Sequence, residues 1–210
     1  MALAERPAGG LRERKKEQVR AALYREALLL FASKGFAATS VDNIVAAADV
    51  SRSTFFRYFP SKEAVVFAGY DEAGEQLCDL LRARPGSEGP IDAYEATSHT
   101  ATDQADLEPH RRVAKARGRL MRSEERLRSR HLEFVKKWER AIADVFAQRA
   151  GRAETAEADL LAASVCITAS NRVSEQWWDS GGSVDPHELI RVEFALLRDL
   201  FSGGSGVRVV

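Results

Sequence analysis

The sequence has little of the chemistry that marks enzymes and metal proteins. Its two cysteines, Cys78 and Cys166, lie far apart, without a CxxC pair or a histidine at ligand spacing, which argues against a zinc site or a disulfide framework. Its four histidines are scattered, and neither a Gly-rich phosphate loop nor a Gly-x-Ser-x-Gly motif is present. We therefore expect no catalytic residues, no metal and no cofactor, and both cysteines are interpreted as small buried apolar residues.

Long apolar runs are also missing. No apolar stretch approaches the roughly 20 residues that a membrane-spanning helix requires, and the positively charged start lacks the apolar stretch of a secretory signal. These absences predict a cytoplasmic protein with no membrane partner. Alternating β-branched stretches long enough for a sheet are absent too, so the predicted fold class is all-α.

The charge is balanced overall but unevenly distributed. The whole chain has a formal net charge of zero, whereas the part through Lys62 holds eleven Lys and Arg against six Asp and Glu, a difference of +5. The remaining chain must therefore carry −5. Such an asymmetry predicts a basic head that contacts phosphates and a more acidic body that does not.

A first amphipathic helix is predicted over residues 13–34, where apolar side chains recur at steps of three and four. It follows a polar segment over residues 1–12, interpreted as a mobile basic arm. Lys34 suits the C-terminus of this helix, and Gly35 suits its left-handed cap.

Two short helices joined by a tight turn are predicted next. Thr39, with Asp42 three residues later, has the spacing of a helix start, and that helix ends just before Asp49. Asp49 can occupy the turn because Asp tolerates a left-handed backbone better than most residues. Ser51 can then cap a helix over residues 52–59.

The second short helix has the composition of a recognition helix. Phe55 and Phe59 lie four residues apart and can face the core, which leaves small polar and cationic side chains to face outward. Base edges are read by such side chains in the major groove. The alternative is a plain three-helix packing module over residues 13–60 with a solvated cationic face. The predicted DNA-binding residues are Thr39, Ser40, Ser51, Arg52, Ser53, Thr54, Arg57, Tyr58 and Lys62.

The rest of the chain, residues 61–202, is predicted to form a helical body of about six helices, followed by a Gly-rich tail over 203–210. Pro60 ends the head and Ser61 caps the next helix, within which the transition from head to body is expected. The stretch over 91–104 is only weakly helical on pattern. Further helices are predicted from beyond Pro109 to about Met121, along Leu127 to Phe146, from Ala156 to about Trp178, and from Pro186 to Phe201.

The last predicted helix is apolar on almost two sides. One row holds Leu189, Val192, Leu196 and Leu200, and a second holds Ile190, Phe194, Leu197 and Phe201. One neighbouring surface is too little to bury both rows, which predicts a homodimer that places two heads on a palindromic operator. A single thick monomer core is the alternative. The helix over 156–178 is a candidate to share the interface.

The segment GFAATSVDNIVAAADVSRSTFFRYFPSKEAV resembles the DNA-binding region of the tetracycline-repressor (TetR) family, and the resemblance covers about residues 15–70. It implies an all-helical dimer with a three-helix head and a body that binds a small molecule. It also implies that Arg52, Ser53 and Arg57 read bases and that Thr39, Tyr58 and Lys62 contact phosphates. The sequence departs from the family pattern at Phe56, where many members have Tyr, and at Asp49, which replaces the usual turn Gly.

The body is similar to a branch of this family described as binding acyl-coenzyme-A-like ligands, through Trp177-Trp178 followed by Asp-Ser-Gly-Gly and the earlier Thr-Phe-Phe-Arg-Tyr-Phe-Pro-Ser-Lys string. The resemblance implies an acyl chain in an apolar tunnel. Each candidate also fits a plain core position, which is the stronger interpretation for an aromatic at helical spacing, and His131 also fits a satisfied core histidine. The candidate effector residues are Phe67, Tyr70, Tyr94, Leu120, Met121, His131, Trp138, Ile142 and Asn171.

Three functions follow from these patterns. The favoured one is a repressor that a small apolar or acyl-type effector, as yet unidentified, releases from its DNA operator by changing the spacing or tilt of the two heads. A helix-turn-helix regulator that works without a small-molecule effector, through a protein partner or as an activator, is the alternative. An enzyme is disfavoured because the motifs of catalysis are missing.

Overall fold

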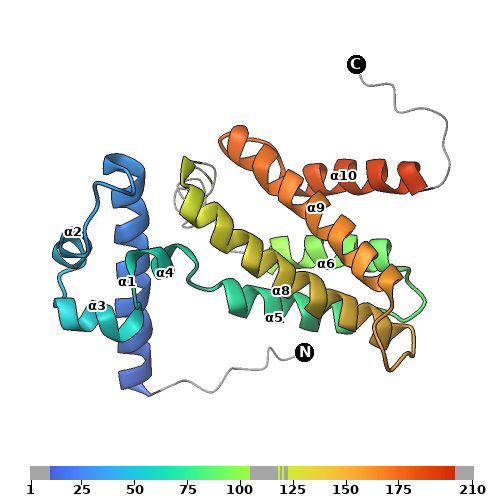
Figure 1. The fold of residues 1–210 in the computed structure, drawn as a ribbon, viewed down its shortest axis with the longest axis horizontal. Coiled ribbons are helices and arrows are strands. Elements are labelled where there is room, and N and C mark those ends of the chain that lie inside the picture. The colour runs from blue at the N-terminus through green and yellow to red at the C-terminus, as the bar shows by residue number, and fades with distance from the viewer. Residues whose placement is uncertain (1–9, 105–117, 119, 121–122, 202–210) are drawn as a thin grey trace. The chain divides into compact units, whose positions relative to one another are not determined.

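The computed structural model describes residues 10–104, 118, 120 and 123–201. These residues form helices joined by turns, with no strand in the described ranges (Figure 1), and the all-α prediction is confirmed. The chain divides into two compact units between Ala68 and Gly69. Among the described helices, none combines the length and apolarity needed to cross a bilayer.

The first unit contains α1 (Leu11–Lys34), α2 (Val41–Ala47), α3 (Arg52–Tyr58) and α4 (Lys62–Val66). The long helix α1 packs against α2 and α4, and α2 packs against α3. Apolar side chains from all of these helices are fully buried, among them Leu23, Ile44, Phe55 and Val65. The unit is therefore a small helical core in which two short helices are braced by a longer one.

Local chemistry at the turns agrees with the sequence. The Ser51 hydroxyl accepts a hydrogen bond from the Thr54 amide at 3.1 Å, and the Ser61 hydroxyl accepts one from the Ala64 amide at 3.2 Å. Asp49 has a φ of 52°, as predicted for the turn. These caps fix where α3 and α4 begin because each satisfies an amide that has no partner inside its helix.

The start of α2 and the cap of α1 differ from the prediction in detail. Ser40, not Thr39, caps α2: its hydroxyl accepts from the Asn43 amide at 3.1 Å, and the Asn43 side chain accepts from the Ser40 amide at 3.0 Å. Gly35 has a positive φ of 86° but a ψ of 154°, so it turns the chain away without adopting the left-handed helical cap.

The break between the units lies eight residues beyond Pro60, where the sequence had placed the end of the head. One continuous fourth helix was expected, but α4 ends at Val66 and α5 begins at Tyr70. Gly69 separates them with a φ of 82°, a conformation that glycine adopts without strain. The short helix α4 is held in the first unit because it packs on α1.

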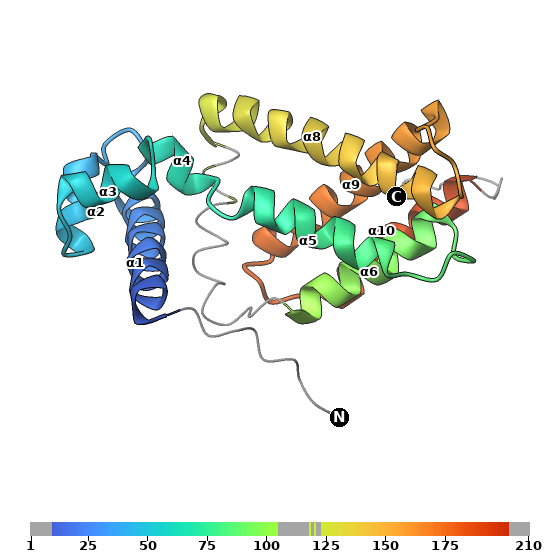
Figure 2. The same ribbon diagram turned by 90° about the horizontal axis from the view of Figure 1, so that it is seen from below.

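The second unit contains α5 (Tyr70–Arg82), α6 (Pro90–Gln104), α8 (Glu125–Arg149), α9 (Glu157–Asp179) and α10 (Pro186–Phe201) among the described residues. Helix α5 packs against α6 and α8, and α9 packs against α6, α8 and α10 (Figure 2). The core between them includes both cysteines, and burial raises the pKa of the Cys166 thiol to about 12. The prediction that the cysteines are buried apolar residues is confirmed.

Residues 91–104 are more helical than their pattern suggested. They belong to α6, in which the hydroxyls of Thr97, Ser98, Thr100 and Thr102 each donate to the carbonyl four residues earlier. These bonds give the Ser and Thr hydroxyls partners inside the helix, so these side chains do not draw the backbone into another conformation. The helix predicted to end near Met121 lies largely outside the described residues.

Polar contacts also join the helices of the second unit, and two groups of them involve the ends of α6. The Arg149 guanidinium donates to the carbonyls of Leu81, Arg84, Pro85 and Glu88 and so closes the turn between α5 and α6. At the other end of α6, the Nδ1 atoms of His99 and His187 lie 2.8 Å apart, which links α6 to α10. Burial, together with the neighbouring His187, lowers the pKa of His99.

Candidate functional site

Helix α3 has a buried side and an exposed side. Phe55 and Phe59 are both buried, with ring centroids 5.8 Å apart, so the prediction that they face the core is confirmed. Arg52, Ser53 and Arg57 are exposed. The helix therefore presents cationic and small polar groups outward while its phenylalanines fix its angle on the unit, an arrangement suited to reading base edges.

Arg52 is held by contacts with two neighbours. Its Nη1 lies 2.6 Å from Asp42 Oδ1 on α2, and its guanidinium carbon lies 5.5 Å from the centroid of the Phe56 ring. The Arg52 and Asp42 side chains are 59% and 68% exposed, so their ion pair contributes about 1 kcal/mol or less. Such a pair orients the guanidinium and can still be exchanged for a nucleic-acid acceptor.

The hydroxyls at the start of α3 are largely engaged with one another. Ser51 Oγ lies 2.9 Å from Ser53 Oγ and 2.8 Å from Thr54 Oγ1. Ser51 and Ser53 are exposed and Thr54 is half-buried. Ser53 is therefore the member of this group best placed to reach outward, while Ser51 is engaged as the cap of α3.

Two residues predicted to contact phosphate instead hold the loop between α1 and α2. Thr39 is only 1% exposed, and its hydroxyl donates to the Gly35 carbonyl at 2.8 Å. Lys62 Nζ donates to the carbonyls of Phe36 at 2.7 Å and Thr39 at 3.0 Å, and it lies 4.5 Å from the centroid of the Phe36 ring. In this arrangement both side chains are engaged within the unit, and their contact with phosphate stays a prediction.

A shallow hollow of about 460 Å³ lies beside these residues in the first unit. Ser40, which is exposed, lines it together with Phe56, Lys62 and Glu63. Phe56 is 46% exposed and presents an apolar ring there, where the resemblance had pointed to a tyrosine hydroxyl. Tyr58 lies half-buried at the end of α3, with the Arg57 guanidinium carbon 5.2 Å from its ring centroid.

Three of the candidate effector residues lie together in the second unit. The Tyr70 ring stacks on Trp138, with centroids 5.5 Å apart, and meets the edge of His131 at 6.0 Å. Phe134, which the sequence reasoning left out of the effector set, completes the cluster at 5.2 Å from Tyr70. Its position one helical turn before Trp138 on the same predicted face was the available signal.

The other candidates are dispersed. Tyr94 stacks on Phe194, and burial raises its pKa strongly; Ile142 lies in the core; Leu120 is buried; and Asn171 is half-buried on α9. Phe67 belongs to the first unit, whereas the other described candidates belong to the second. Met121 lies outside the described residues.

A groove of about 300 Å³ runs between α5 and α8. Its apolar lining includes Trp138, Cys78 and Ala141, and Gly74 provides the space for the indole, because a Cβ there would lie 2.4 Å from Trp138 Nε1. Three carboxylates and two cations rim it. These rim residues are Asp71, Glu75, Asp79, Arg82 and Lys137.

The rim carries a net negative charge, with three carboxylates against two cations. Lys137 is paired with Asp71, and Arg82 Nη1 lies 2.8 Å from Asp79 Oδ1. Glu75 has no ion pair among the residues that the structure describes, so the carboxylates of the rim outnumber its cations by one. An anionic head group is disfavoured at this rim, and a neutral or cationic one is favoured.

The two short helices, their turn and the bracing helix define a protein of the helix-turn-helix class. The family model described as "Bacterial regulatory proteins, tetR family" matches residues 23–68, and the "MftR C-terminal domain" model matches residues 91–202. The chain belongs to the TetR family of bacterial regulatory proteins.

Individual proteins agree with this placement. The chain is 42% identical to the HTH-type transcriptional regulator TcmR of Streptomyces glaucescens over 84 residues, which cover 40% of this chain and 37% of TcmR. It is 38% identical over 116 residues to the HTH-type transcriptional regulator EthR of Mycolicibacterium smegmatis, which cover 49% of each protein. The chain thus spans about half the length of these relatives, or less.

Solved structures support the fold over a larger share of the chain. The fatty acid degradation regulator FadR from Bacillus halodurans superposes with a TM-score of 0.62 at 20% identity, covering 97% of this chain and 99% of that one. At this identity the likeness concerns the fold.

Proposed function

We propose that this protein is a sequence-specific DNA-binding transcriptional regulator that binds a palindromic operator as a homodimer and represses transcription until a small effector releases it. The observation that carries the proposal is the exposed side of α3, where Arg52 and Ser53 project from a helix anchored by Phe55 and Phe59. A braced helix of this kind fits the major groove.

The test is binding to labelled DNA from the gene's own upstream region. Arg52→Ala is expected to weaken operator binding about 10- to 100-fold for each of the two heads because a good bidentate base contact is worth roughly 1–3 kcal/mol of discrimination, while binding to random DNA changes little. Binding is measured by fluorescence anisotropy at fixed salt.

Asp42→Ala is the matched control because it removes the same ion pair from the other side. It should leave operator binding intact or slightly tighter, since it frees the guanidinium. Equal losses in both variants would mean that Arg52 acts only by pairing with Asp42. Wild-type binding no tighter than to random DNA would count against the proposed function.

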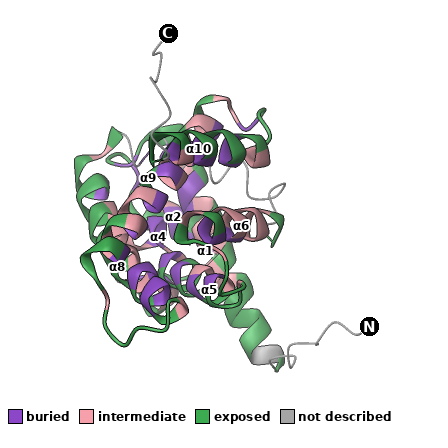
Figure 3. Cartoon of the chain, turned by 90° about the vertical axis from the view of Figure 1, so that its right-hand side faces the viewer, coloured by how far each residue is buried: buried purple, intermediate pink, exposed green. Residues whose placement is uncertain are grey.

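The homodimer is supported by the two sides of α10 (Figure 3). Ile190, Phe194 and Leu197 are buried in the unit's own core. Leu196 and Leu200 are 47% and 63% exposed, and they belong to an apolar surface formed by exposed residues of α9 and α10. That α9/α10 face consists of Leu161, Val192, Leu196, Leu200 and Phe201.

A group of large exposed apolar side chains of this kind is typical of an interaction site, and a second copy of the chain is the occupant that a two-fold operator requires. Leu189, which the sequence placed in one row with Leu196 and Leu200, is buried together with Ile190, Phe194 and Leu197. The first turn of α10 therefore contributes one exposed apolar side chain fewer to the α9/α10 face than the sequence pattern predicted.

The groove between α5 and α8 supports a small apolar effector. The negatively balanced rim favours a neutral or cationic head group over a free carboxylate, so an acyl-type effector would fit best with its acid group masked. A ligand there would contact both α5, which begins the second unit, and α8. It can release DNA only to the extent that it prefers the state that does not bind DNA.

A thermal-shift series with matched tails tests this effector proposal. Octyltrimethylammonium and 1-octanol are expected to raise the melting temperature, and octanoate is not, because a ligand stabilises only the state that it binds. Glu75→Gln should reduce the preference for the cation over octanoate without lowering the melting temperature of the free protein. No shift with any of the compounds would favour the regulator that works without a small-molecule effector.

A further inference from the structure

A second cleft in the first unit has neither Arg52 nor Ser53 in its lining. Its volume is about 290 Å³, and it opens between α1 and the C-terminal end of α3. Lys15, Lys16 and Val19 line it from α1, and Arg57 and Tyr58 line it from α3. We call these five residues the cationic cleft.

The charge of the cationic cleft is strongly positive. Three of its five residues are cations, and the other two, Val19 and Tyr58, form a half-buried apolar surface. The Arg57 guanidinium carbon lies 5.2 Å from the Tyr58 ring centroid, a stacking contact that limits its rotamers. Arg57 lines the same cleft as the two lysines of α1.

One carboxylate lies nearby. Lys16 Nζ is 2.7 Å from Glu13 Oε1, one helical turn away, and both side chains are more than half exposed. A pair of this kind contributes about 1 kcal/mol or less. Lys16 can therefore exchange Glu13 for a phosphate at little cost, and the excess of cations in the cleft remains.

We propose that the cationic cleft binds a backbone phosphate of operator DNA, with Arg57 as its main ligand and Lys15 and Lys16 as supporting charges. This inference rests on the proposed function. It reassigns Arg57 from the base-reading set to the phosphate-binding set. The planar guanidinium matches two phosphate oxygens, whereas the two ammonium groups act as point charges.

DNA is the occupant that the surroundings favour. The cleft borders the same helix, α3, that presents Arg52 and Ser53 to base edges, so a duplex bound along α3 brings its backbone to both ends of the helix. Phosphate contacts of this kind fix the register of a protein on DNA without reading sequence. The cationic cleft would therefore add affinity for any sequence and leave discrimination to Arg52.

The test measures binding to operator and to random DNA over a range of salt concentrations. The variants are Arg57→Ala and the double variant Lys15→Ala/Lys16→Ala. Each should weaken binding to both DNAs by the same factor, about three- to tenfold for each phosphate interaction that it removes. Each should also make the salt dependence shallower. The negative slope of log K against log salt should lose about one unit of its magnitude for every such interaction in a bound head. The ratio of operator to random affinity should stay constant.

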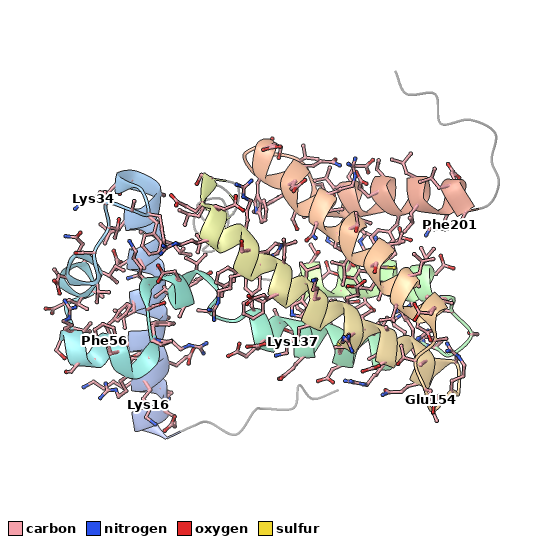
Figure 4. The ribbon with its side chains drawn as sticks, viewed as in Figure 1. Lys16, Lys34, Phe56, Lys137, Glu154 and Phe201 are labelled. Atoms are coloured by element: carbon pink, nitrogen blue, oxygen red, sulfur yellow. The ribbon has the colours of Figure 1, made fainter. Side chains whose placement is uncertain are left out.

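Lys34→Ala is the control because Lys34 is an exposed lysine at the opposite end of α1 (Figure 4) and lies about 27 Å from Lys16 at 1.5 Å per residue. It should leave the salt slope unchanged. The conservative variant Lys15→Arg/Lys16→Arg should preserve the slope, and melting curves confirm that each variant is folded.

Two outcomes would overturn the proposal while the regulator stands. The first is a salt slope in the double lysine variant equal to that of Lys34→Ala. The second is a loss of the operator-to-random ratio in Arg57→Ala, which would restore Arg57 to base reading. A wild-type protein that binds no DNA would be a failure of the proposed function itself.

Discussion

Replacing Leu196 and Leu200 together by glutamate is expected to convert the dimer into monomers. Each leucine removed from a buried interface costs roughly 1.5–3 kcal/mol, and two-fold symmetry counts each substitution twice. The dissociation constant should therefore rise by at least about a thousandfold, and operator affinity should fall with it because two linked heads no longer bind together. Sedimentation velocity over a concentration series measures the change.

A matched control uses another exposed leucine. Leu132 on α8 is 59% exposed, close to the 63% of Leu200, but it lies outside the α9/α10 face. Leu132→Glu should leave the sedimentation coefficient unchanged, whereas Leu200→Glu alone should already weaken the dimer. If the double variant sediments as the wild type does, the interface lies elsewhere; a wild type that is monomeric at all concentrations would remove the dimer from the proposal.

Phe55→Ala, which truncates a core side chain of the recognition helix α3, should unfold the first unit. Phe55 is fully buried, and a Phe→Ala change in a core typically costs about 3–5 kcal/mol through reduced burial and the cavity left behind. Because the chain forms two compact units, hydrogen exchange should accelerate in residues 10–68 and much less in the second unit. Operator binding should be lost at temperatures where the wild type binds.

The adjacent Phe56 provides an internal comparison. It is 46% exposed, and its ring meets Phe55 edge-on with centroids 5.3 Å apart. Phe56→Ala should cost far less stability than Phe55→Ala, although it removes the same number of atoms one position away. Similar exchange rates in the two variants would show that α3 is not anchored as the structure indicates.

Local signals in this sequence were sufficient to predict most of the helix-turn-helix. The partners of the caps are close in sequence: Ser51 and Ser61 each bond to an amide three residues later. The turn at Asp49 is likewise local, so these features could be recognised without a structure. The choice between Thr39 and Ser40 could not be made in this way, because two neighbouring hydroxyls offer the same chemistry. Which one caps α2 depends on the burial of Thr39, a property of the folded unit.

Contacts between distant residues were beyond the sequence pattern. Lys62 bonds to the Phe36 carbonyl across 26 residues, and nothing near Lys62 indicates that its charge is used inside the unit. The stacking of Tyr70 on Trp138 likewise depends on how α5 and α8 pack. The break at Gly69 was missed because a single glycine in a helical pattern can be tolerated within a helix.

The two sides of α10 also make the stability of the protein depend on how many copies of it a cell contains. One side completes the core of its own protomer, and the other is proposed to be covered only when a second chain arrives, so part of the helix's stabilisation follows mass action. In a cell that makes few copies, each chain would spend more time as a monomer with an open apolar surface, exposed to proteases. The number of molecules would then set the lifetime of the regulator as well as the occupancy of its operator.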